Sequence, residues 1–271
     1  MIKQAIIPLA GLGTRLLPLT SVIPKELLPI NGKPGLEYIL EECISSGITE
    51  IIFIISKKKE NIKKYFYNDS FYKKIIKKKK NDKKLIFEYK KIQKYKKLIK
   101  FVYQNSPKGT GDAILKCKKL IKSNFFLMLM PDDLIIEENC SKTLIKLHNK
   151  YKSSIIASKK VNKKNVSRWG VFNLKKINNR NFYIKDVIEK PSIKSAPSNY
   201  AVIGRYILSK DIFQVLKNQK PGKNGEIHIT DSIRTLILSK KKFIGHIFAG
   251  KYLDCGSMDG YINSSIKISK L

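Results

Sequence analysis

The order of apolar segments and turns in the first 56 residues constrains the fold more than any other feature of this sequence. Residues 2–9, IKQAIIPL, form an apolar run of strand length, and residues 50–56, EIIFIIS, form another. Between them, LEYILEECISS places apolar side chains at helical spacing, and Gly47 follows where a helix C-terminal cap favours glycine. A strand, a helix and a strand in this order predict a right-handed crossover between parallel strands.

The same alternation continues along the chain. We predict further strands at 98–104, 125–131 and 154–160, helices at about 111–121 and 140–151, and short strands with polar loops over 171–207. No internal repeat and no linker rich in Gly, Pro or Ser divides the chain. With 42% hydrophobic residues for a core, we expect a three-layer α/β fold in one domain spanning 1–271.

The segment 57–97 differs in composition, because it is dense in lysine and tyrosine. A basic stretch with interleaved aromatic residues is one way to bind single-stranded RNA. The alternative is a solvated, Lys-rich helical excursion from the core, which we favour because six apolar residues could give it a buried side. These are Phe66, Phe71, Ile75, Ile76, Leu85 and Ile86.

The net charge of +34 by itself suggests a polyanionic partner such as nucleic acid, anionic lipid or a polyphosphate. Only five of the 55 basic residues are arginine, however, and Lys, Ile, Asn and Tyr, which are all abundant, share A/T-rich codons. Proteins that read bases and bind phosphates with bidentate contacts favour Arg over Lys. We therefore attribute the charge to genome composition and expect no nucleic-acid partner.

The cysteines and histidines indicate neither a metal centre nor a nucleophile. Cys43, Cys117, Cys140 and Cys255 are far apart, without the spacing of a zinc site, which is typical of a reduced cytoplasmic protein. The three histidines, at 148, 228 and 246, have no Ser or Cys at an informative spacing. No charged leader or apolar run of about 18 residues is present, so we expect a soluble, unprocessed protein without a membrane partner.

The loop after the first strand carries the most specific chemistry. In open α/β sheets, ligands bind beyond the carboxyl ends of strands, and Gly11 and Gly13 stand at that place. A dinucleotide fingerprint and a P-loop are both excluded because Leu16 occupies the position where each requires glycine. An anion-binding loop remains, with Arg15 and Lys25 as its charges and with prolines that restrict its backbone.

The loop GLGTRLLPLTSVIPKELLP fills the pattern GxGTRxxPxTxxxPKxxLP, which resembles the signature loop of the sugar-1-phosphate nucleotidylyltransferases. The resemblance continues in order through QNSPKGTGDAIL, LMPDDL, VIEKPS, GEIHITDSI and DCGSMDGY, so that it covers residues 5 to 261 from AIIPLAGLGTRLLPLT onward. The blocks SPKGTGDA and GEIHITD favour the uridylyl branch. The resemblance implies a Rossmann-like three-layer α/β/α nucleotidyltransferase fold with a mixed, mostly parallel central sheet. It also implies that UTP and glucose 1-phosphate are converted to UDP-glucose and pyrophosphate with the help of Mg²⁺.

The resemblance also assigns the nucleotide site. Arg15 and Lys25 would be catalytic, stabilising charge on the departing pyrophosphate, although either could be a surface ion pair. The amide of Gln104 would meet the uracil edge, and Asp112 would open the following helix. The nucleotide-binding set is Ala10, Gly11, Gly13, Thr14, Gln104, Gly109, Gly111 and Asp132. Gly109 and Gly111 could instead form an ordinary turn and helix cap.

For the metal, Asp132 matches the family's magnesium ligand, because a carboxylate at a strand end suits Mg²⁺. Asp254 is the candidate second ligand, although it could equally cap a turn. Asp133 is expected in a loop or at a helix N-cap.

For the sugar phosphate, the resemblance implies Gly170, Glu189, Lys190, Asn199 and Thr230. Glu189 would accept from glucose hydroxyls, and Lys190 would meet the phosphate. Thr230 followed by Asp231 can also be interpreted as a helix start.

Three alternatives stay open. The first keeps the fold and uses dTTP or another sugar phosphate, as a thymidylyltransferase does; the second is a nucleic-acid-binding protein; and the third, a nicotinamide oxidoreductase, is disfavoured by Leu16. The family also usually continues beyond the point where this chain stops, with a helical segment that contributes to subunit contacts. We expect a homo-oligomer, but the short C-terminus leaves its form open.

Overall fold

The central sheet is mixed, as the resemblance implies. The computed structural model of the chain describes residues 1–80, 82–222 and 225–271. Within that part, one sheet has nine strands in the order β5-β4-β1-β6-β11-β8-β12-β10-β9. Seven of them run in one direction, whereas β11 (Tyr200–Ser209) and β10 (Asn181–Glu189) run in the other. The expected mixed and mostly parallel sheet is confirmed.

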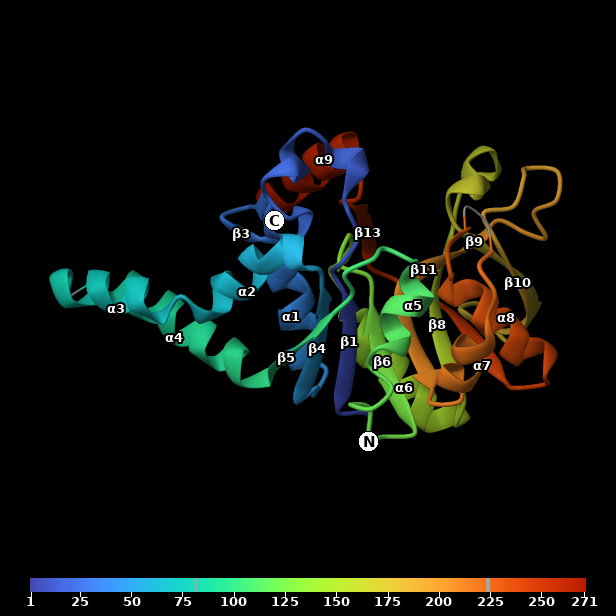
Figure 1. Cartoon of the computed structure of the whole chain (residues 1–271). Coiled ribbons are helices and arrows are strands. Elements are labelled where there is room, and N and C mark those ends of the chain that lie inside the picture. Colours follow the sequence, from blue (N-terminus) through green and yellow to red (C-terminus); the bar gives the residue numbers. More distant parts are fainter. Residues whose placement is uncertain (81, 223–224) are drawn as a thin grey trace.

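The strands lie in the apolar runs of the sequence. Four adjacent parallel strands, arranged across Figure 1, are β5 (Ile99–Tyr103), β4 (Glu50–Ile55), β1 (Gln4–Pro8) and β6 (Phe125–Leu129). The remaining strands of the sheet are β8 (Ser154–Lys160), β9 (Gly170–Lys176) and β12 (Phe243–Ile247). Ala5 of β1 is in register with Ile51 on one side and with Leu127 on the other. Because β1 and β4 are buried on both faces, they show no polar alternation.

Helices cover both faces of the sheet, which makes three layers. On one face, α1 (Gly35–Ser45) and α6 (Cys140–Tyr151) bury Leu40 and Leu144 in the same cluster as Ile7. On the other face, α5 (Thr110–Leu115), α7 (Ile212–Asn218) and α8 (Ile229–Leu238) bury their apolar sides with Ile6. Successive residues of β1 therefore serve the two layers in turn. The α/β/α architecture is confirmed.

The helix predicted at about 111–121 is shorter than expected. α5 ends at Leu115, and the chain continues in turns whose backbone bonds span three residues, such as Cys117 N–H to the Ile114 carbonyl at 2.9 Å. The buried side chain of Gln4 binds the end of this segment: its amide donates to the Leu120 carbonyl, and its oxygen accepts from Lys122 N–H. The hydrogen bonds from Gln4 hold residues 120–122 outside a helix. The local sequence could not indicate them, because Gln4 is more than 100 residues away.

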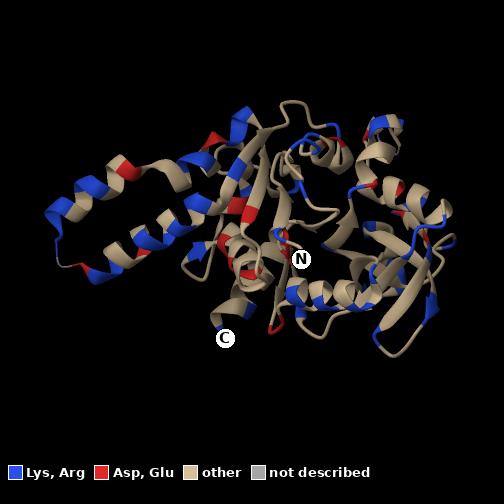
Figure 2. Cartoon of the chain, turned by 90° about the horizontal axis from the view of Figure 1, so that it is seen from below, with Lys and Arg blue, Asp and Glu red and all other residues tan. Residues whose placement is uncertain are grey.

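Residues 57–98 form an arm that projects from the sheet (Figure 1). It consists of η4 (Lys57–Lys59), α2 (Glu60–Tyr67), α3 (Asp69–Lys78) and α4 (Lys83–Leu98). Figure 2 shows basic side chains, all of them lysine in this segment, along the helices of the arm. Only part of the predicted buried side is present: Phe66 is buried, but Phe71 is 55% exposed and α3 buries no residue. The reason is that α3 packs on α4 and lies away from the sheet.

A small second layer stands above the carboxyl edge of the sheet. There β7 (Asp133–Ile136) pairs with β13 (Lys251–Asp254), β2 (Pro29–Ile30) pairs with β3 (Lys33–Pro34), and α9 (Met258–Ser269) packs against β13 and β2. Figure 1 shows α9, near the C-terminus, beside the loop that follows β1. None of the described helices combines the length and apolar character that a bilayer span requires.

Candidate active site

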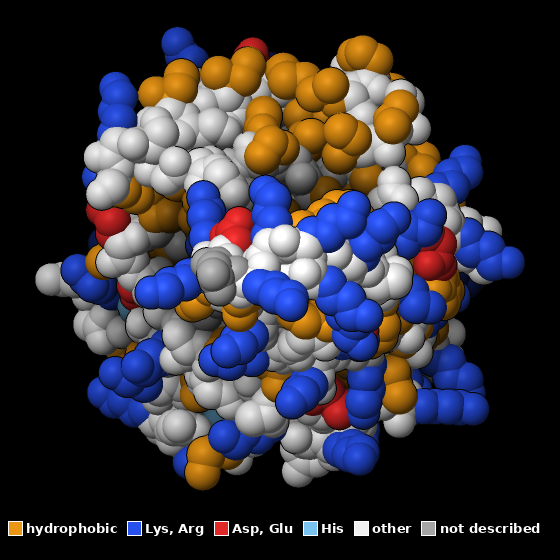
Figure 3. Space-filling view, turned by 90° about the vertical axis from the view of Figure 1, so that its left-hand side faces the viewer, with side chains coloured by type: hydrophobic (Ala, Val, Ile, Leu, Met, Phe, Trp, Pro, Cys, Tyr) orange, Lys and Arg blue, Asp and Glu red, His pale blue; other side chains and the backbone are white. Residues whose placement is uncertain are grey.

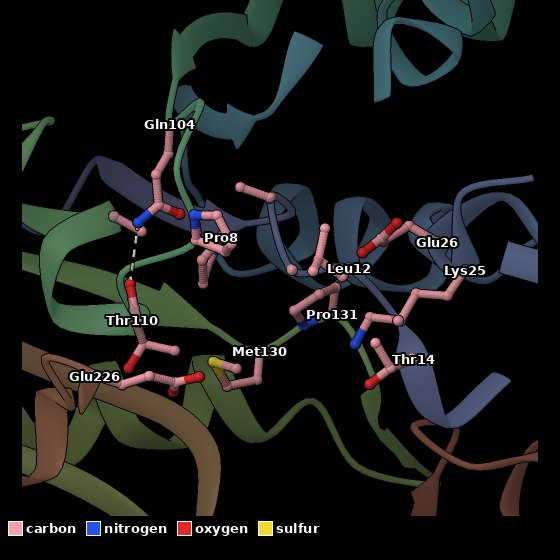
Figure 4. A pocket seen from close by; sticks show the side chains of 16 residues that line it. Pro8, Leu12, Thr14, Lys25, Glu26, Gln104, Thr110, Met130, Pro131 and Glu226 are labelled. Carbon is pink, nitrogen blue, oxygen red and sulfur yellow. Dashed lines mark hydrogen bonds between the residues drawn. The ribbon is translucent and has the colours of Figure 1, made fainter. Parts of the chain in front are cut away.

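A cavity of about 360 Å³ lies at the carboxyl ends of the parallel strands. Its walls come from the loop after β1, the start of α5, the residue after β5 and the end of β6, which meet because these strands run in parallel. Figure 4 shows Gln104 and Lys25 at opposite ends of this cavity. The volume is in the range of small-ligand sites.

The glycine loop forms one wall of the cavity. Ala10, Gly11, Gly13 and Thr14 all line it, as predicted for a nucleotide cradle. Gly13 has φ +71°, where L side chains are strained, and a Cβ there would lie 3.1 Å from Thr20 Cγ2. The Thr20 hydroxyl donates to the Gly13 carbonyl at 2.8 Å, so the loop is folded back on itself.

Lys25 and Asp132 form an ion pair beside this loop. Lys25 Nζ lies 2.7 Å from Asp132 Oδ2, and both side chains are largely buried. Burial is the largest single influence and disfavours both charges, but the attraction and hydrogen bond of the pair, together with Glu26 near Lys25 and Arg15 near Asp132, outweigh it. The pKa of Lys25 is therefore raised and that of Asp132 is lowered. Arg15 Nη2 is 3.8 Å from the same Oδ2, and the Arg15 side chain is 62% exposed. The structure thus brings together the three charges predicted for the triphosphate.

Asp133 is neither a loop residue nor a helix cap, which corrects the sequence expectation. It begins β7, and its half-buried carboxylate accepts from Gly204 N–H at 2.8 Å and from the Tyr252 hydroxyl at 2.6 Å. Burial and the neighbouring Asp132 charge raise the pKa of Asp133 to about 6. Because Tyr252 lies on β13, Asp133 fixes the strand that carries Asp254.

Asp132 and Asp254 converge on one small space. A Cβ placed on Gly256 would lie 2.7 Å from Arg15 Nη2, 2.9 Å from Asp132 Oδ2 and 3.1 Å from Asp254 Oδ1, so the exposed Arg15 side chain borders the same space. Asp254 also caps a turn, since its Oδ1 accepts from Gly256 N–H, and its Oδ2 accepts from Arg168 at 2.6 Å. Capping this turn is therefore compatible with the other expected role of Asp254, that of a metal ligand. Two carboxylates around a space that any side chain at 256 would fill suit a small, oxygen-seeking cation.

A buried arginine supports the strand end that leads to Asp132. Arg205 is fully buried and donates through Nε and Nη2 to Glu42 on α1, at 2.8–3.0 Å. Its Nη1 donates to the carbonyls of Met130 and Gly204. Burial by itself would lower the pKa of Arg205, but the charge of Glu42 and its hydrogen bonds, together with nearby Asp133, raise that pKa. A charged residue within the apolar run YAVIGRYILS was a signal that the sequence did contain.

Gln104, directly after β5, presents an oriented amide. Its Nε2 donates to the Gly109 carbonyl at 3.1 Å and to Asp112 Oδ2 at 2.7 Å. Both partners only accept hydrogen bonds, so the nitrogen must face them, and among the described residues no donor binds the amide oxygen. The Gln104 amide therefore offers its oxygen, an acceptor, for a further partner. Asp112 orients it from the first turn of α5 and does not cap the helix.

The two glycines of PKGTGDA have different roles. Gly109 lines the cavity at φ +98°. Gly111 lies behind the cavity wall, where a Cβ would come within 2.7 Å of Leu216 Cδ2 and 2.8 Å of Ile227 Cγ2. Its N–H donates to the Ile227 carbonyl at 2.7 Å. Gly111 thus permits close packing of the protein on itself and does not contact the space for a base, contrary to the sequence expectation.

Three of the predicted sugar residues come together. A Cβ on Gly170 would lie 3.2 Å from Thr230 Cγ2 and 3.3 Å from Glu189 Oε2. Thr230 lies in the first turn of α8, so the interpretation as a helix start also holds. Lys190 follows Glu189 with its Nζ 3.8 Å from Glu189 Oε1. The Asn199 amide instead donates to the Val161 carbonyl, which makes it part of the strand pairing.

Sequence reasoning missed several residues of this region. Glu226, Thr110 and Met130 line the cavity, and Glu26 and Lys59 form a buried ion pair at 2.8 Å beside Lys25. Lys59 lies in the run KKK, where nothing distinguishes it from its exposed neighbours. No histidine lines the cavity in the described part of the chain.

The comparisons with known proteins agree with this geometry. The model of the nucleotidyl transferase family matches residues 4–270. A UTP–glucose-1-phosphate uridylyltransferase of Pseudomonas aeruginosa is 36% identical over 268 residues, covering 98% of this chain and 95% of the relative. Among solved structures, a UDP-glucose pyrophosphorylase complexed with UDP-glucose superposes with a TM-score of 0.87 at 40% identity, over 100% of this chain and 99% of that one. A UTP-bound enzyme of the same kind from Acinetobacter baumannii gives 0.88 at 31% identity, over 99% and 93%.

Proposed function

This chain belongs to the nucleotidyl transferase family, and we propose that it transfers the uridylyl group of UTP to glucose 1-phosphate, releasing pyrophosphate and forming UDP-glucose. The observation that carries this proposal is the ion pair of Lys25 with Asp132 beside a glycine loop that lines a cavity. In the reaction, a phosphate oxygen of glucose 1-phosphate attacks the α-phosphorus of UTP while the bond to the pyrophosphate oxygen breaks. One phosphoanhydride replaces another, so the reaction is readily reversible.

Catalysis in this site rests on positioning and charge. Two polyanions must approach each other, and Lys25 and Arg15 supply positive charge where the pyrophosphate leaves. The raised pKa of Lys25 keeps its ammonium charged at physiological pH. The backbone of Gly11 and Gly13 lets phosphates approach closely. No covalent intermediate is required.

We propose Mg²⁺ as the cation at Asp132 and Asp254. The convergence of the two carboxylates on the space at Gly256 supports this assignment, because Mg²⁺ binds few protein oxygens and completes its shell with water and phosphate. When bound, the ion would neutralise phosphate charge. Titration of Mg²⁺ into Asp254→Asn, without nucleotide, should show weaker binding than in the wild type. Equal affinity would remove Asp254 from the metal site.

The oriented amide of Gln104 supports a uracil substrate. The imide N–H of uracil or thymine can donate to the free Gln104 oxygen, whereas cytosine and adenine present an acceptor at the corresponding ring nitrogen. For the sugar phosphate, we propose that Gly170, Glu189 and Thr230 bind glucose and that Lys190 meets its phosphate. Asn199 would contribute through the strand that it holds in place.

The substrate is tested by offering the purified protein UTP, dTTP, GTP, CTP or ATP with glucose 1-phosphate and measuring pyrophosphate release. We expect the largest kcat/KM with UTP. A preference for dTTP would move the protein to the thymidylyl branch. A preference for GTP or ATP would contradict the proposal, because both carry purine bases and the uridylyl assignment requires a pyrimidine.

We further propose that the chain is one domain and forms a cytoplasmic homo-oligomer. Figure 3 shows hydrophobic side chains gathered at the top of the molecule, where the loop after β1 and α9 lie. The exposed apolar residues of these elements are Leu12, Leu17, Leu19, Val22, Ile23, Ile262 and Ile266. Contact between copies would cover this surface. Light scattering measures the molar mass in solution. We expect the wild type to have the mass of more than one chain and Val22→Ser to have a lower mass. A wild type with the mass of a single chain would contradict the proposal.

A further inference from the structure

A second hollow lies directly beside Lys25. It measures about 210 Å³ and is walled by the 12–24 loop on one side and by the end of β4 with η4 on the other. Leu12 and Lys25 line both this hollow and the nucleotide cavity. The two spaces are therefore neighbours that share the loop as a partition.

The side chain of Ser56 is the most informative feature of the hollow. Ser56 follows β4, is only 8% exposed, and its hydroxyl has no hydrogen-bond partner among the described residues. Thr20 and Ser21 also line the hollow, but their hydroxyls donate to the carbonyls of Gly13 and Pro18. A buried hydroxyl without a partner is unfavourable for the fold, which points to a ligand that completes its bonding.

The charges around the hollow favour an anion. Lys25, Lys58 and Lys59 line it. The acidic neighbour Glu26 is buried and held by Lys59 through both of its oxygens at 2.8 Å, so its charge is compensated. Lys58 forms no ion pair with any described residue and is exposed at the mouth. An ammonium and a hydroxyl that lack partners are donors suited to phosphate oxygens.

We propose that this hollow receives the pyrophosphate leaving group, with Ser56 and Lys58 as binding residues and Lys25 between it and the reacting nucleotide. This inference rests on the proposed function, because pyrophosphate is its second product. Once its bond to the α-phosphorus has broken, pyrophosphate is a separate polyanion beside Lys25, and movement past Leu12 takes it away from the newly formed UDP-glucose. The hollow has room for it, being several times the roughly 30 Å³ that one water occupies.

The test uses Ser56→Ala, Lys58→Gln and the double variant. Lys57→Gln is the matched control, because Lys57 is an exposed neighbour that does not line the hollow. In the reverse reaction, from UDP-glucose and pyrophosphate, we expect the KM for pyrophosphate to rise about tenfold in the double variant, while the KM for UDP-glucose stays unchanged. Titration of pyrophosphate alone should show the same loss of affinity.

Stability separates binding from a structural role. Ser56→Ala removes a hydroxyl that binds nothing in the fold, so its Tm should stay equal or rise. A KM for pyrophosphate within about twofold of the wild type in the double variant would overturn the inference. An equal increase in the KM for UDP-glucose would do the same, because it would indicate general damage to the site. A wild type that forms no UDP-glucose from UTP would instead refute the proposed function.

Discussion

At the scale of single residues, each charged side chain of the site keeps its charge because an oppositely charged side chain lies next to it. Asp132 is largely buried next to Asp133, and it keeps its negative charge because Lys25 lies 2.7 Å away. Asp133 carries the opposite perturbation, with its pKa raised to about 6. Two adjacent carboxylates thus have separate surroundings: Asp132 pairs with Lys25, and Asp133 holds Tyr252 and the strand of Asp254.

We expect Asp132→Asn and Lys25→Met each to lower kcat for pyrophosphate release about 100-fold or more, because each removes a preorganised charge from the transition state. Circular dichroism should show that both variants remain folded. Lys33→Met is the control, because Lys33 forms a comparable pair with Glu41 away from the cavity. Activity near that of the wild type in either site variant would remove the residue from the mechanism.

Base selection can be tested at Asp112. An asparagine there can donate as well as accept, so only the Gly109 carbonyl would still restrict the orientation of the Gln104 amide. We expect the ratio of kcat/KM for UTP over CTP to fall about tenfold in Asp112→Asn. Lys116→Gln removes only the 3.6 Å pair of Asp112 with Lys116, and its UTP preference should persist. Unaltered selectivity in Asp112→Asn would show that another group selects the base.

At the scale of elements, Gly11 of the sequence GLG and Gly111 of the sequence GTG have different roles. A Cβ on Gly11 meets nothing within 4 Å, whereas on Gly111 it collides with α7 and with Ile227. We expect Gly111→Ala to lower the free energy of unfolding by about 1–3 kcal/mol. Gly11→Ala should leave stability within about 0.5 kcal/mol and instead raise the KM for UTP, because it adds a methyl group to the cavity wall. Urea unfolding and KM measurements on both variants test this contrast.

His246 on β12 links pH to the pairing of β12 with β10. Its Nδ1 bonds Asn181 Oδ1 at 2.8 Å, and its buried Nε2 has no partner among the described residues. Burial lowers the pKa of His246 below 6.5, more than the nearby Glu138 raises it. As the pH falls below 6.5, His246 is therefore protonated in the unfolded chain at a higher pH than in the folded one. Protonation thus favours the unfolded chain, and the free energy of unfolding decreases as the pH falls.

In His246→Phe, we expect the free energy of unfolding to fall less steeply between about pH 7.5 and pH 5.5 than in the wild type. The difference in slope should stay below about 1.4 kcal/mol per pH unit, the limit for one proton. Urea unfolding at several pH values measures it. Parallel curves for the two proteins would show that His246 does not contribute.

At the scale of the whole molecule, the charge of +34 is spread over the surface and along the arm (Figure 2). The nucleotide site itself balances Lys25 and Arg15 against Asp132. We therefore expect that adding single-stranded RNA changes the rate of uridylyl transfer by less than about twofold at physiological salt, because the binding of RNA to scattered lysines is weak and screened by salt. Strong inhibition that persisted at about 0.5 M salt would support the nucleic-acid alternative.

Much of this molecule could be predicted because its signals are local. Apolar runs marked β1, β4, β5, β6 and β8, and the alternation with helices indicated a parallel arrangement in which strand ends meet. The loop GLGTRLLPLTSVIPKELLP indicated Arg15 and Lys25 through its spacing. These features depend on neighbours within a few residues, or on one motif.

Other features depend on segments that are distant in the chain, and only the tertiary structure decided them. Asp133 became a strand residue because Tyr252 and Gly204 bind it, and Gly111 became a packing position because Ile227 lies against it. Lys59 was selected from a lysine run because Glu26 is buried beside it. By itself, the sequence determined which elements form and which chemistry they carry, since residue type and local periodicity encode both. The fold decided which polar groups are buried, paired or left without a partner, because burial depends on which distant segments come together.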